Sequence, residues 1–322
     1  MLIEAKAPVR VADCGGWTDT WFAGTGLVCS VAVEPGAWAT IAPAPAGSTE
    51  MVVNGRSVPP EEHPLLWATL DHFGPVAPAR IEVGAGVPPG CGTGTSASVV
   101  VALLSALSAW RDMPHPEPPD PGTIAAEAHA VEVGLGWQSG IQDQQAAAWG
   151  GISLIEMAEY PHAIRRQVPV SQETRQTLDH LLVTVYLGRP HRSSGVHEQV
   201  IAQLDTRTPS PLLRPLREAA AAAAQALTDG DLVAYGQALS ANTDAQKRLH
   251  CDLVGPDAQA IIELARRHEA LGWKVNGAGG DGGTVTVLLA GDRSGFAHAL
   301  AATPWSILDL HLARRGVTVE IS

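Results

Sequence analysis

The sequence has few cysteines and no pattern of metal-binding side chains. Its four cysteines are scattered without a Cys-x-x-Cys pair, and the histidines lack the spacing of zinc ligands. We therefore expect no zinc site. The scattered cysteines, together with a first segment that shows no basic and apolar leader, indicate a reducing, cytoplasmic location.

Long hydrophobic runs and an excess of positive charge are also absent. No apolar run approaches the length of a membrane span, and the formal net charge is −12. These properties argue against a membrane or nucleic-acid partner, and a bound phosphate would have to be attracted by local cations or a metal. Hydrophobic residues make up 45% of the 322 positions, which suits a large buried interior in two packed halves. The sequence specifies no oligomeric state.

The most informative segment that is present is residues 87–98, Val-Pro-Pro-Gly-Cys-Gly-Thr-Gly-Thr-Ser-Ala-Ser. Its glycines let the backbone approach an anion without a side chain in the way. The hydroxyls that follow add donors where a helix beginning near residue 97 presents unpaired N–H groups and the positive end of its dipole. The segment therefore predicts a phosphate-binding loop between a strand at 80–83 and a helix at 97–110.

Two other glycine signatures have to be weighed for this loop. A P-loop needs a lysine after its last glycine, and no lysine or arginine lies between Ile81 and Trp110, so a P-loop is excluded. Residues 92–97 fit the dinucleotide fingerprint Gly-x-Gly-x-x-Gly/Ala, but the expected acidic residue would be Asp112, which lies in a proline-dense loop. A glycine-rich turn that binds nothing is the third alternative, and the hydroxyls at the helix start favour a phosphate site.

Asp19 and Asp143 are the two carboxylates that stand out. The pattern of residues 6–20 predicts a strand that ends in a glycine pair. Trp17 and Asp19, just after this pair, are suited to binding a sugar, because the indole ring can cover an apolar sugar face and the carboxylate can accept hydrogen bonds from sugar hydroxyls. A turn residue that caps its own backbone is the alternative for Asp19. Asp143 stands alone in the uncharged run 133–153, which favours a functional carboxylate over a buried acid satisfied by backbone amides.

A second glycine-rich turn lies at residues 274–283, Lys-Val-Asn-Gly-Ala-Gly-Gly-Asp-Gly-Gly. Five of its last seven residues are glycine, and a strand is expected directly after it, at 284–289. A flexible hairpin needs fewer glycines, so this composition indicates that the backbone passes close to a ligand.

The hydrophobic pattern predicts an α+β fold in which each half has its own sheet. Prolines and a polar run interrupt the pattern near the middle, so we expect an N-terminal domain at 1–170 and a C-terminal domain at 171–322. Further strands are expected at 3–12, 27–33, 38–42, 151–157, 181–187, 305–310 and 317–321, and helices at 64–73, 123–133, 194–204, 212–227, 232–249 and 257–271.

Three motifs, in order along the chain, resemble those of the GHMP small-molecule kinases. They are Ala7-Pro-Val-Arg-Val with Gly-Gly-Trp-Thr-Asp-Thr, then Pro88-Pro-Gly-Cys-Gly-Thr-Gly-Thr-Ser-Ala, then Gly277-Ala-Gly-Gly-Asp-Gly-Gly. The first motif and Gly-x-Gln-Asp-Gln are most similar to the branch of L-fucokinase and D-glycero-D-manno-heptose 7-phosphate kinase. The resemblance implies an N-terminal half of the ribosomal protein S5-like type, a ferredoxin-like C-terminal half, and an active site between them.

The resemblance also implies ATP and Mg²⁺ as cofactors and a role for each matching residue. Asp143 is expected beside the acceptor hydroxyl as general base or electrostatic orienter, with Arg10 near it and the transferred phosphoryl group. Ser96 and Glu132 are expected to bind Mg²⁺. The residues expected to bind ATP are Pro89, Gly90, Cys91, Gly92, Thr93, Gly94, Thr95 and Ser96. The residues expected to bind the substrate are Gly16, Trp17, Thr18, Asp19, Gly277, Gly279 and Gly280.

The function implied by the resemblance is ATP-dependent phosphorylation of a sugar or sugar phosphate at the anomeric hydroxyl, with an L-fucose-like or heptose 7-phosphate substrate. A decarboxylase of the diphosphomevalonate type is disfavoured by the sugar-like Gly-Gly-Trp-Thr-Asp turn. A regulator that binds sugar and ATP without turnover stays open, because Asp281 places a carboxylate where the third motif usually has glycine. Arg189, His191 and Arg192 are candidate partners for a phosphate on the sugar, with exposed loop residues as the alternative.

Overall fold

The computed structural model describes residues 2–44, 47–115, 119–190, 194–204 and 210–322. The strands are β1 (Ile3–Cys14), β2 (Gly26–Pro43), β3 (Glu50–Val53), β4 (Arg56–Ser57), β5 (Ala79–Ala85), β6 (Ile152–Glu159), β7 (His162–Gln167), β8 (Leu182–Tyr186), β9 (Gly272–Val275), β10 (Thr284–Leu288), β11 (Ser306–Leu308), β12 (His311–Leu312) and β13 (Thr318–Ile321). The helices are α1 (Pro64–Phe73), α2 (Thr95–Arg111), α3 (Pro121–Gly134), α4 (Gln142–Trp149), α5 (Gln172–Leu181), α6 (Ser194–Leu204), α7 (Arg214–Asp229), α8 (Leu232–Leu249), α9 (Pro256–Arg267) and α10 (Arg293–Leu300), with short 3₁₀ helices η1 (Pro211–Leu213) and η2 (Cys251–Leu253). The fold is α+β, as the sequence predicts.

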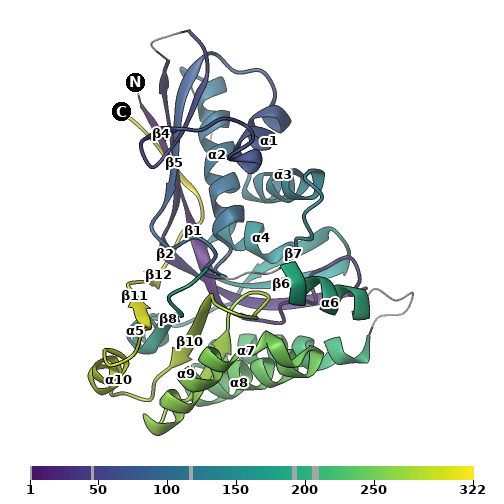
Figure 1. Ribbon diagram of the computed structural model, residues 1–322, viewed down its shortest axis with the longest axis vertical. Coiled ribbons are helices and arrows are strands. Elements are labelled where there is room, and N and C mark those ends of the chain that lie inside the picture. The colour runs from purple at the N-terminus through teal and green to yellow at the C-terminus, as the bar shows by residue number, and fades with distance from the viewer. Residues whose placement is uncertain (1, 45–46, 116–118, 191–193, 205–209) are drawn as a thin grey trace.

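The first sheet has nine strands and is built around the long strand β2. β2 pairs with β1 along one edge and with β6 and then β5 along the other. The two strands predicted at 27–33 and 38–42 are parts of this one strand, whose register against β1 shifts between Ala7 and Val9. β13 pairs with the free edge of β1, so the two ends of the chain lie together (Figure 1).

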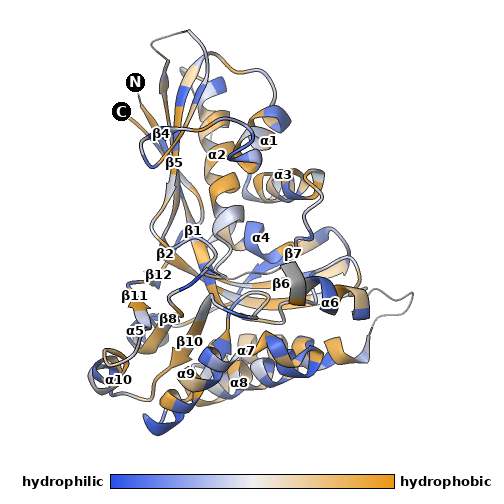
Figure 2. Cartoon of the chain, in the orientation of Figure 1, coloured by the Kyte–Doolittle hydropathy of each residue, from blue (hydrophilic) through white to orange (hydrophobic). Residues whose placement is uncertain are grey.

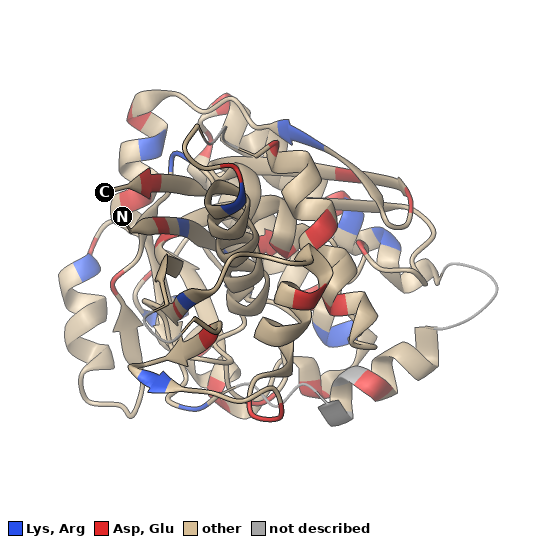
Figure 3. Cartoon of the chain, turned by 90° about the horizontal axis from the view of Figure 1, so that it is seen from above, with Lys and Arg blue, Asp and Glu red and all other residues tan. Residues whose placement is uncertain are grey.

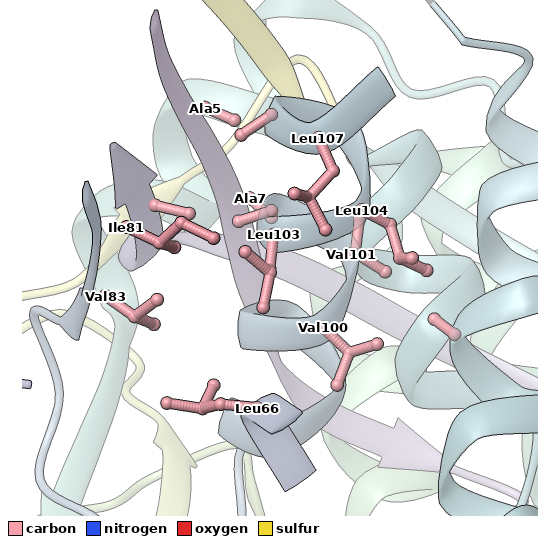
Figure 4. Packing of buried hydrophobic residues seen from close by; sticks show 14 of the residues in the cluster. Ala5, Ala7, Leu66, Ile81, Val83, Val100, Val101, Leu103, Leu104 and Leu107 are labelled. Carbon is pink, nitrogen blue, oxygen red and sulfur yellow. The ribbon is translucent and has the colours of Figure 1, made fainter. Parts of the chain in front are cut away.

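Helix α2 fills the space between the first sheet and helices α1 and α3. Its side chains Leu103, Leu104 and Leu107 pack in one apolar cluster with Ala5 of β1 and Ile81 of β5 (Figure 4). Figure 2 shows α2 as hydrophobic over most of its length, whereas α7 and α8 mix hydrophobic and hydrophilic positions. A helix that is apolar on nearly all sides is stable only when neighbours cover it. The core therefore fixes the place of α2 and of the glycine-rich loop at its N-terminus.

The second sheet has four antiparallel strands in the order β11-β8-β10-β9. The helix predicted at 257–271 ends earlier, at Arg267, because Glu269 adopts a positive φ of 53° and the chain turns into β9. Each half has its own sheet, as expected, although β12 and β13 return to the first sheet. The domain division at residue 170 stays a prediction.

In the cartoon of Figure 3, acidic and basic residues are interspersed along the described parts of the chain. Among the described residues, no helix is both long enough and apolar enough to span a bilayer. Charge that could hold a phosphate must therefore be sought in local arrangements, and the junction of the two sheets provides one.

Candidate active site between the two sheets

The predicted phosphate loop connects β5 to α2, as expected, and both sheets hold it. The backbone N–H of Arg10 donates to the carbonyl of Thr93 at 2.9 Å, and the hydroxyl of Ser98 donates to the carbonyl of Pro8 at 2.7 Å. From the second sheet, the hydroxyl of Thr284 donates to the carbonyl of Cys91 at 2.7 Å. The loop is thus anchored through the carbonyl groups of Cys91 and Thr93, and the helix that follows it through the hydroxyl of Ser98.

The N-terminus of α2 is suited to an anion. Gly94, with a φ of 73°, precedes the helix and has no side chain that could cap it. Gly90 and Gly92 also have positive φ values, of 66° and 74°, which other residues rarely adopt. The first N–H groups of α2 therefore lack a capping side chain and can donate to a phosphate.

Arg10 and Asp143 meet against this loop, although they are far apart in the sequence. Arg10 Nε donates to Asp143 Oδ1 at 2.7 Å, and the guanidinium also donates to the carbonyl oxygen of Gly92. A Cβ on Gly94 would lie only 2.9 Å from Asp143 Cγ, so the carboxylate touches the backbone at the start of α2. Arg10 is 4% exposed and Asp143 25% exposed. Only the carboxylate is open enough to meet a ligand directly.

Asp19 explains why α4 begins beside the loop. Its carboxylate accepts from the N–H of Gln142, the first residue of α4, at 3.0 Å and also from its own backbone N–H, so it caps α4 as well as its own turn. Gly140 leaves room for this contact, because a Cβ there would lie 2.2 Å from Asp19 Oδ2. Burial, with a further contribution from Asp143, raises the pKa of Asp19 to about 6. The contact places Asp143 one residue into the helix.

Glu132 of α3 forms the metal-binding candidate with Ser96. Its carboxylate accepts from the hydroxyl of Ser139 and the side-chain amide of Gln144, both at 2.6 Å, and from Ser96. Burial and the charge of Asp143 raise the pKa of Glu132 to about 7, against the lowering effect of these hydrogen bonds. A divalent cation would favour the ionised form, and carboxylate and hydroxyl oxygens are ligands that Mg²⁺ accepts. The residues present therefore fit magnesium.

The turn at residues 16–19 is more buried than the sequence suggests. Trp17 is only 5% exposed and packs in an apolar cluster with Phe22 and Ile141, so its ring does not present an open face. Thr18 is fully buried, and its hydroxyl donates to the carbonyl of Gly15 at 2.7 Å. Direct contacts of Trp17 and Thr18 with a sugar stay predictions.

The third motif packs directly on the phosphate loop. A Cβ on Gly277 would lie 2.9 Å from the carbonyl oxygen of Gly92, and Asn276 accepts from the N–H of Ala12 at 2.9 Å. Gly279 and Gly280 instead lie against η2, where a Cβ on Gly279 would lie 2.4 Å from the carbonyl oxygen of Leu253. The motif therefore holds the second sheet against the first, and its contact with substrate stays a prediction.

Asp281 does not face the phosphate loop. Its side chain is 67% exposed and pairs with Arg189, which also donates to Asp257 at 2.6 Å. Arg189, a candidate for binding a phosphate on the sugar, is thus engaged by two carboxylates. The other candidates, His191 and Arg192, lie outside the described residues.

Two charged residues at the centre of the site were not predicted. Asp13, at the end of β1, has no exposed surface, and Lys274 of β9 is 1% exposed, with Nζ 3.4 Å from Asp13 Oδ1. The signal in the sequence was a carboxylate inside a strand whose neighbours are apolar, which is costly to bury without a cation.

The fold and the site together define an α+β architecture of two sheets, with a glycine-rich loop at a helix N-terminus and no P-loop lysine. Residues 64–151 match the family model of the GHMP kinases N terminal domain. The chain carries this domain and has the GHMP kinase fold, as the three motifs predicted.

Similar proteins agree with this assignment. The chain is 24% identical over 197 residues to a D-glycero-alpha-D-manno-heptose 7-phosphate kinase of Campylobacter jejuni, covering 61% of this chain and 57% of that protein. It is 24% identical over 329 residues to an L-fucokinase/L-fucose-1-P guanylyltransferase of Bacteroides fragilis, covering 87% of this chain and 34% of that protein. A solved D-glycero-D-manno-heptose 1-phosphate kinase of Bacteroides thetaiotaomicron superposes with a TM-score of 0.76 at 19% identity, covering 99% of both chains. The match thus spans 57% of the length of the heptose 7-phosphate kinase and 34% of the length of the fucokinase/guanylyltransferase.

Proposed function

We propose that the protein is an ATP-dependent sugar kinase that transfers the terminal phosphoryl group of ATP to the anomeric hydroxyl of a sugar or sugar phosphate. The observation that carries the proposal is the Arg10–Asp143 pair, which lies against Gly94 at the start of α2. A carboxylate, a buried guanidinium and the N-terminus of a helix meet there. Phosphoryl transfer depends mainly on such positioning and charge neutralisation.

The proposed roles of Asp143 and Arg10 follow from how exposed each side chain is. Asp143, the more open partner, accepts the proton of the acceptor hydroxyl or orients that hydroxyl. Arg10, held in place by two hydrogen bonds, offers positive charge beside the loop. Ser96 and Glu132 would hold Mg²⁺, which supplies further positive charge to the phosphates where a P-loop would use its lysine.

Asp19 is the residue proposed to recognise sugar hydroxyls. Its carboxylate is buried and influenced by Asp143, so the two groups share one electrostatic environment. A hydroxyl donor from a sugar would stabilise the charged form of Asp19. The similar heptose 7-phosphate kinase and L-fucokinase support an L-fucose-like or heptose 7-phosphate substrate.

In the sequence, Asp281 alone leaves open a regulator that binds sugar and ATP without turnover. Because that side chain is exposed and paired with Arg189, we find no observation in the described part of the chain that favours this alternative.

ADP release with a panel of free and phosphorylated sugars tests the proposal. We expect Mg²⁺-dependent ADP release with L-fucose or a heptose 7-phosphate, and a product phosphorylated at the anomeric oxygen by ³¹P NMR. Tight sugar binding by calorimetry without ADP release from any member of the panel would contradict the proposal and support a sensor.

A further inference from the structure

Asp13 and Lys274 form a buried ion pair that joins the two sheets. Asp13 is the last residue but one of β1 in the first sheet, and Lys274 lies in β9 of the second. Their side chains are 0% and 1% exposed, and 3.4 Å separates Lys274 Nζ from Asp13 Oδ1. Lys274 Nζ also donates to the side-chain carbonyl of Gln246 at 3.3 Å. Lys274, the first residue of the second glycine-rich turn at residues 274–283, therefore has its side chain inside the protein.

The carboxylate of Asp13 also holds the second glycine-rich turn, at residues 274–283. The N–H of Gly277 lies 3.1 Å from each carboxylate oxygen of Asp13. Gly277 in turn packs on the carbonyl of Gly92, which accepts from Arg10. Asp13 thus contacts the turn that presses on the phosphate loop.

Arg10 lies between two carboxylates. Its Nε is 2.7 Å from Asp143 Oδ1, and its Nη1 is 3.9 Å from Asp13 Oδ1. Burial opposes the charge of Arg10, but the two carboxylates outweigh burial and raise the pKa of the guanidinium. A buried carboxylate without a cation is strongly unfavourable, so Asp13 would compete with Asp143 for Arg10 if nothing else neutralised it.

We propose that Lys274 and Asp13 are positioning residues for phosphoryl transfer: Lys274 neutralises Asp13, so that Arg10 stays directed at Asp143 and the phosphate loop. The inference rests on the proposed kinase function. A role limited to holding the two sheets together is the competing explanation, because the pair also crosses from one sheet to the other.

The substitution Lys274→Met removes the charge and keeps an apolar stem of similar length. We expect kcat to fall about 100-fold, as for a misplaced reacting group, while the KM for ATP changes much less. The double substitution Asp13→Asn with Lys274→Met removes both charges and should recover most of kcat, because Arg10 then has one carboxylate to pair with. Lys247→Met, on the exposed surface of α8, is the matched control and should leave kcat unchanged.

The Nε–H resonance of Arg10, assigned with Arg10→Lys in ¹⁵N-arginine-labelled protein, reports the pairing without any turnover. In the wild type we expect slow exchange with water, because Asp143 accepts this proton. Exchange should accelerate in Lys274→Met and slow again in the double variant. The melting temperature of each variant, measured in parallel, separates a loss of folding from a change at Arg10.

Three results would overturn the inference. They are wild-type kcat in Lys274→Met, an unchanged Arg10 resonance in that variant, or a double variant that regains its melting temperature but not its kcat. If the wild type turns over no sugar, the kinase proposal fails, and the Arg10 resonance still decides whether Lys274 directs the guanidinium.

Discussion

The four acidic side chains at the centre of the site fall into two pairs that are neutralised differently. Asp143 and Asp13 lie on either side of Arg10, within 2.7 and 3.9 Å of its nitrogens. Glu132 and Asp19 accept from hydroxyl and amide donors, and burial raises their pKa values to about 7 and about 6. The first pair contacts a cation of the chain, and the second pair accepts its hydrogen bonds from neutral groups.

This difference indicates which side of the site a ligand completes. A buried carboxylate held only by neutral donors lowers the stability of the free protein, and a cation or new hydrogen-bond donors would reverse this. Under the proposed function, Mg²⁺ supplies the charge at Glu132 and sugar hydroxyls supply donors at Asp19. In this proposal, Asp143 and Asp13 are already paired with cations before any ligand binds. Glu132 and Asp19 gain their partners only when Mg²⁺ and the sugar bind.

The largest expected effect is on the paired side, from Asp143→Asn. Removing the carboxylate that faces the acceptor should lower kcat by about 10²- to 10⁴-fold, the range for a positioned proton acceptor. ATP affinity, measured by calorimetry, should change little, because the loop and α2 are untouched. Asp71→Asn, on the exposed surface of α1, is the control. A variant with near-normal kcat would remove Asp143 from the mechanism.

The next effect is on the other pair, from Glu132→Gln. The amide can still accept from Ser139 and Gln144, so the fold should persist, but its oxygen binds Mg²⁺ poorly. We expect the Mg²⁺ concentration for half-maximal activity to rise about 100-fold, measured by ADP release. Glu127→Gln, on the same helix, should leave it unchanged. An unaltered Mg²⁺ dependence in Glu132→Gln would place the metal elsewhere.

Asp19→Asn should stabilise the free protein above pH 6 while it weakens sugar binding. Because the pKa of Asp19 is about 6 in the fold and near 3.8 in the unfolded chain, the folded state holds the proton more tightly between these values. The free energy of unfolding therefore falls as pH rises from about 4 to about 6, by at most about 3 kcal/mol, and stays reduced at higher pH. In the Asp19→Asn variant the side chain does not titrate, so this fall in the free energy of unfolding is absent.

Urea unfolding of both proteins at pH 4, 5, 6 and 8 checks this prediction. Glu132 adds a similar slope up to about pH 7, but it is common to both proteins and cancels in the difference. The difference in unfolding free energy should grow from pH 4 to 6 and then level off. If the difference in unfolding free energy did not change with pH, the pKa of Asp19 would not be raised by burial.

The sequence predicted the glycine-rich loop before α2, but not the contacts that build the site around it. The glycines of residues 90–94 were identifiable because an anion loop needs both positive φ values and a following helix. Helix α4 was missed, since its sequence is rich in glutamine and alanine and shows no apolar stripe. Its start depends on Asp19, a contact across more than a hundred residues that no local pattern contains.

Burial is the second quantity that the sequence left open. The sequence predicted that the ring of Trp17 covers an apolar face of a sugar. In the structure, apolar residues from α6, α8 and η1 help to enclose this ring. Lys274 lies in the glycine-rich turn whose backbone the sequence places near a ligand, but in the structure its side chain is buried beside Asp13. Both outcomes depend on how the two sheets pack, and packing over long sequence distances is not encoded in a window of neighbouring residues.

The smallest expected effect comes from Asp281→Asn, which tests whether any acid outside the two pairs matters. Asp281 is exposed, and Arg189 would keep Asp257 as a partner, so the free energy of unfolding should change by less than about 0.5 kcal/mol. The KM for ATP should stay within about twofold, because a screened surface charge acts weakly on the phosphate loop. Activity at 0.05 and 0.5 M salt provides the control, since any residual effect of this charge should vanish at the higher concentration. A tenfold lower KM for ATP in the variant would mean that Asp281 repels the phosphates, and the regulator without turnover would again be a candidate.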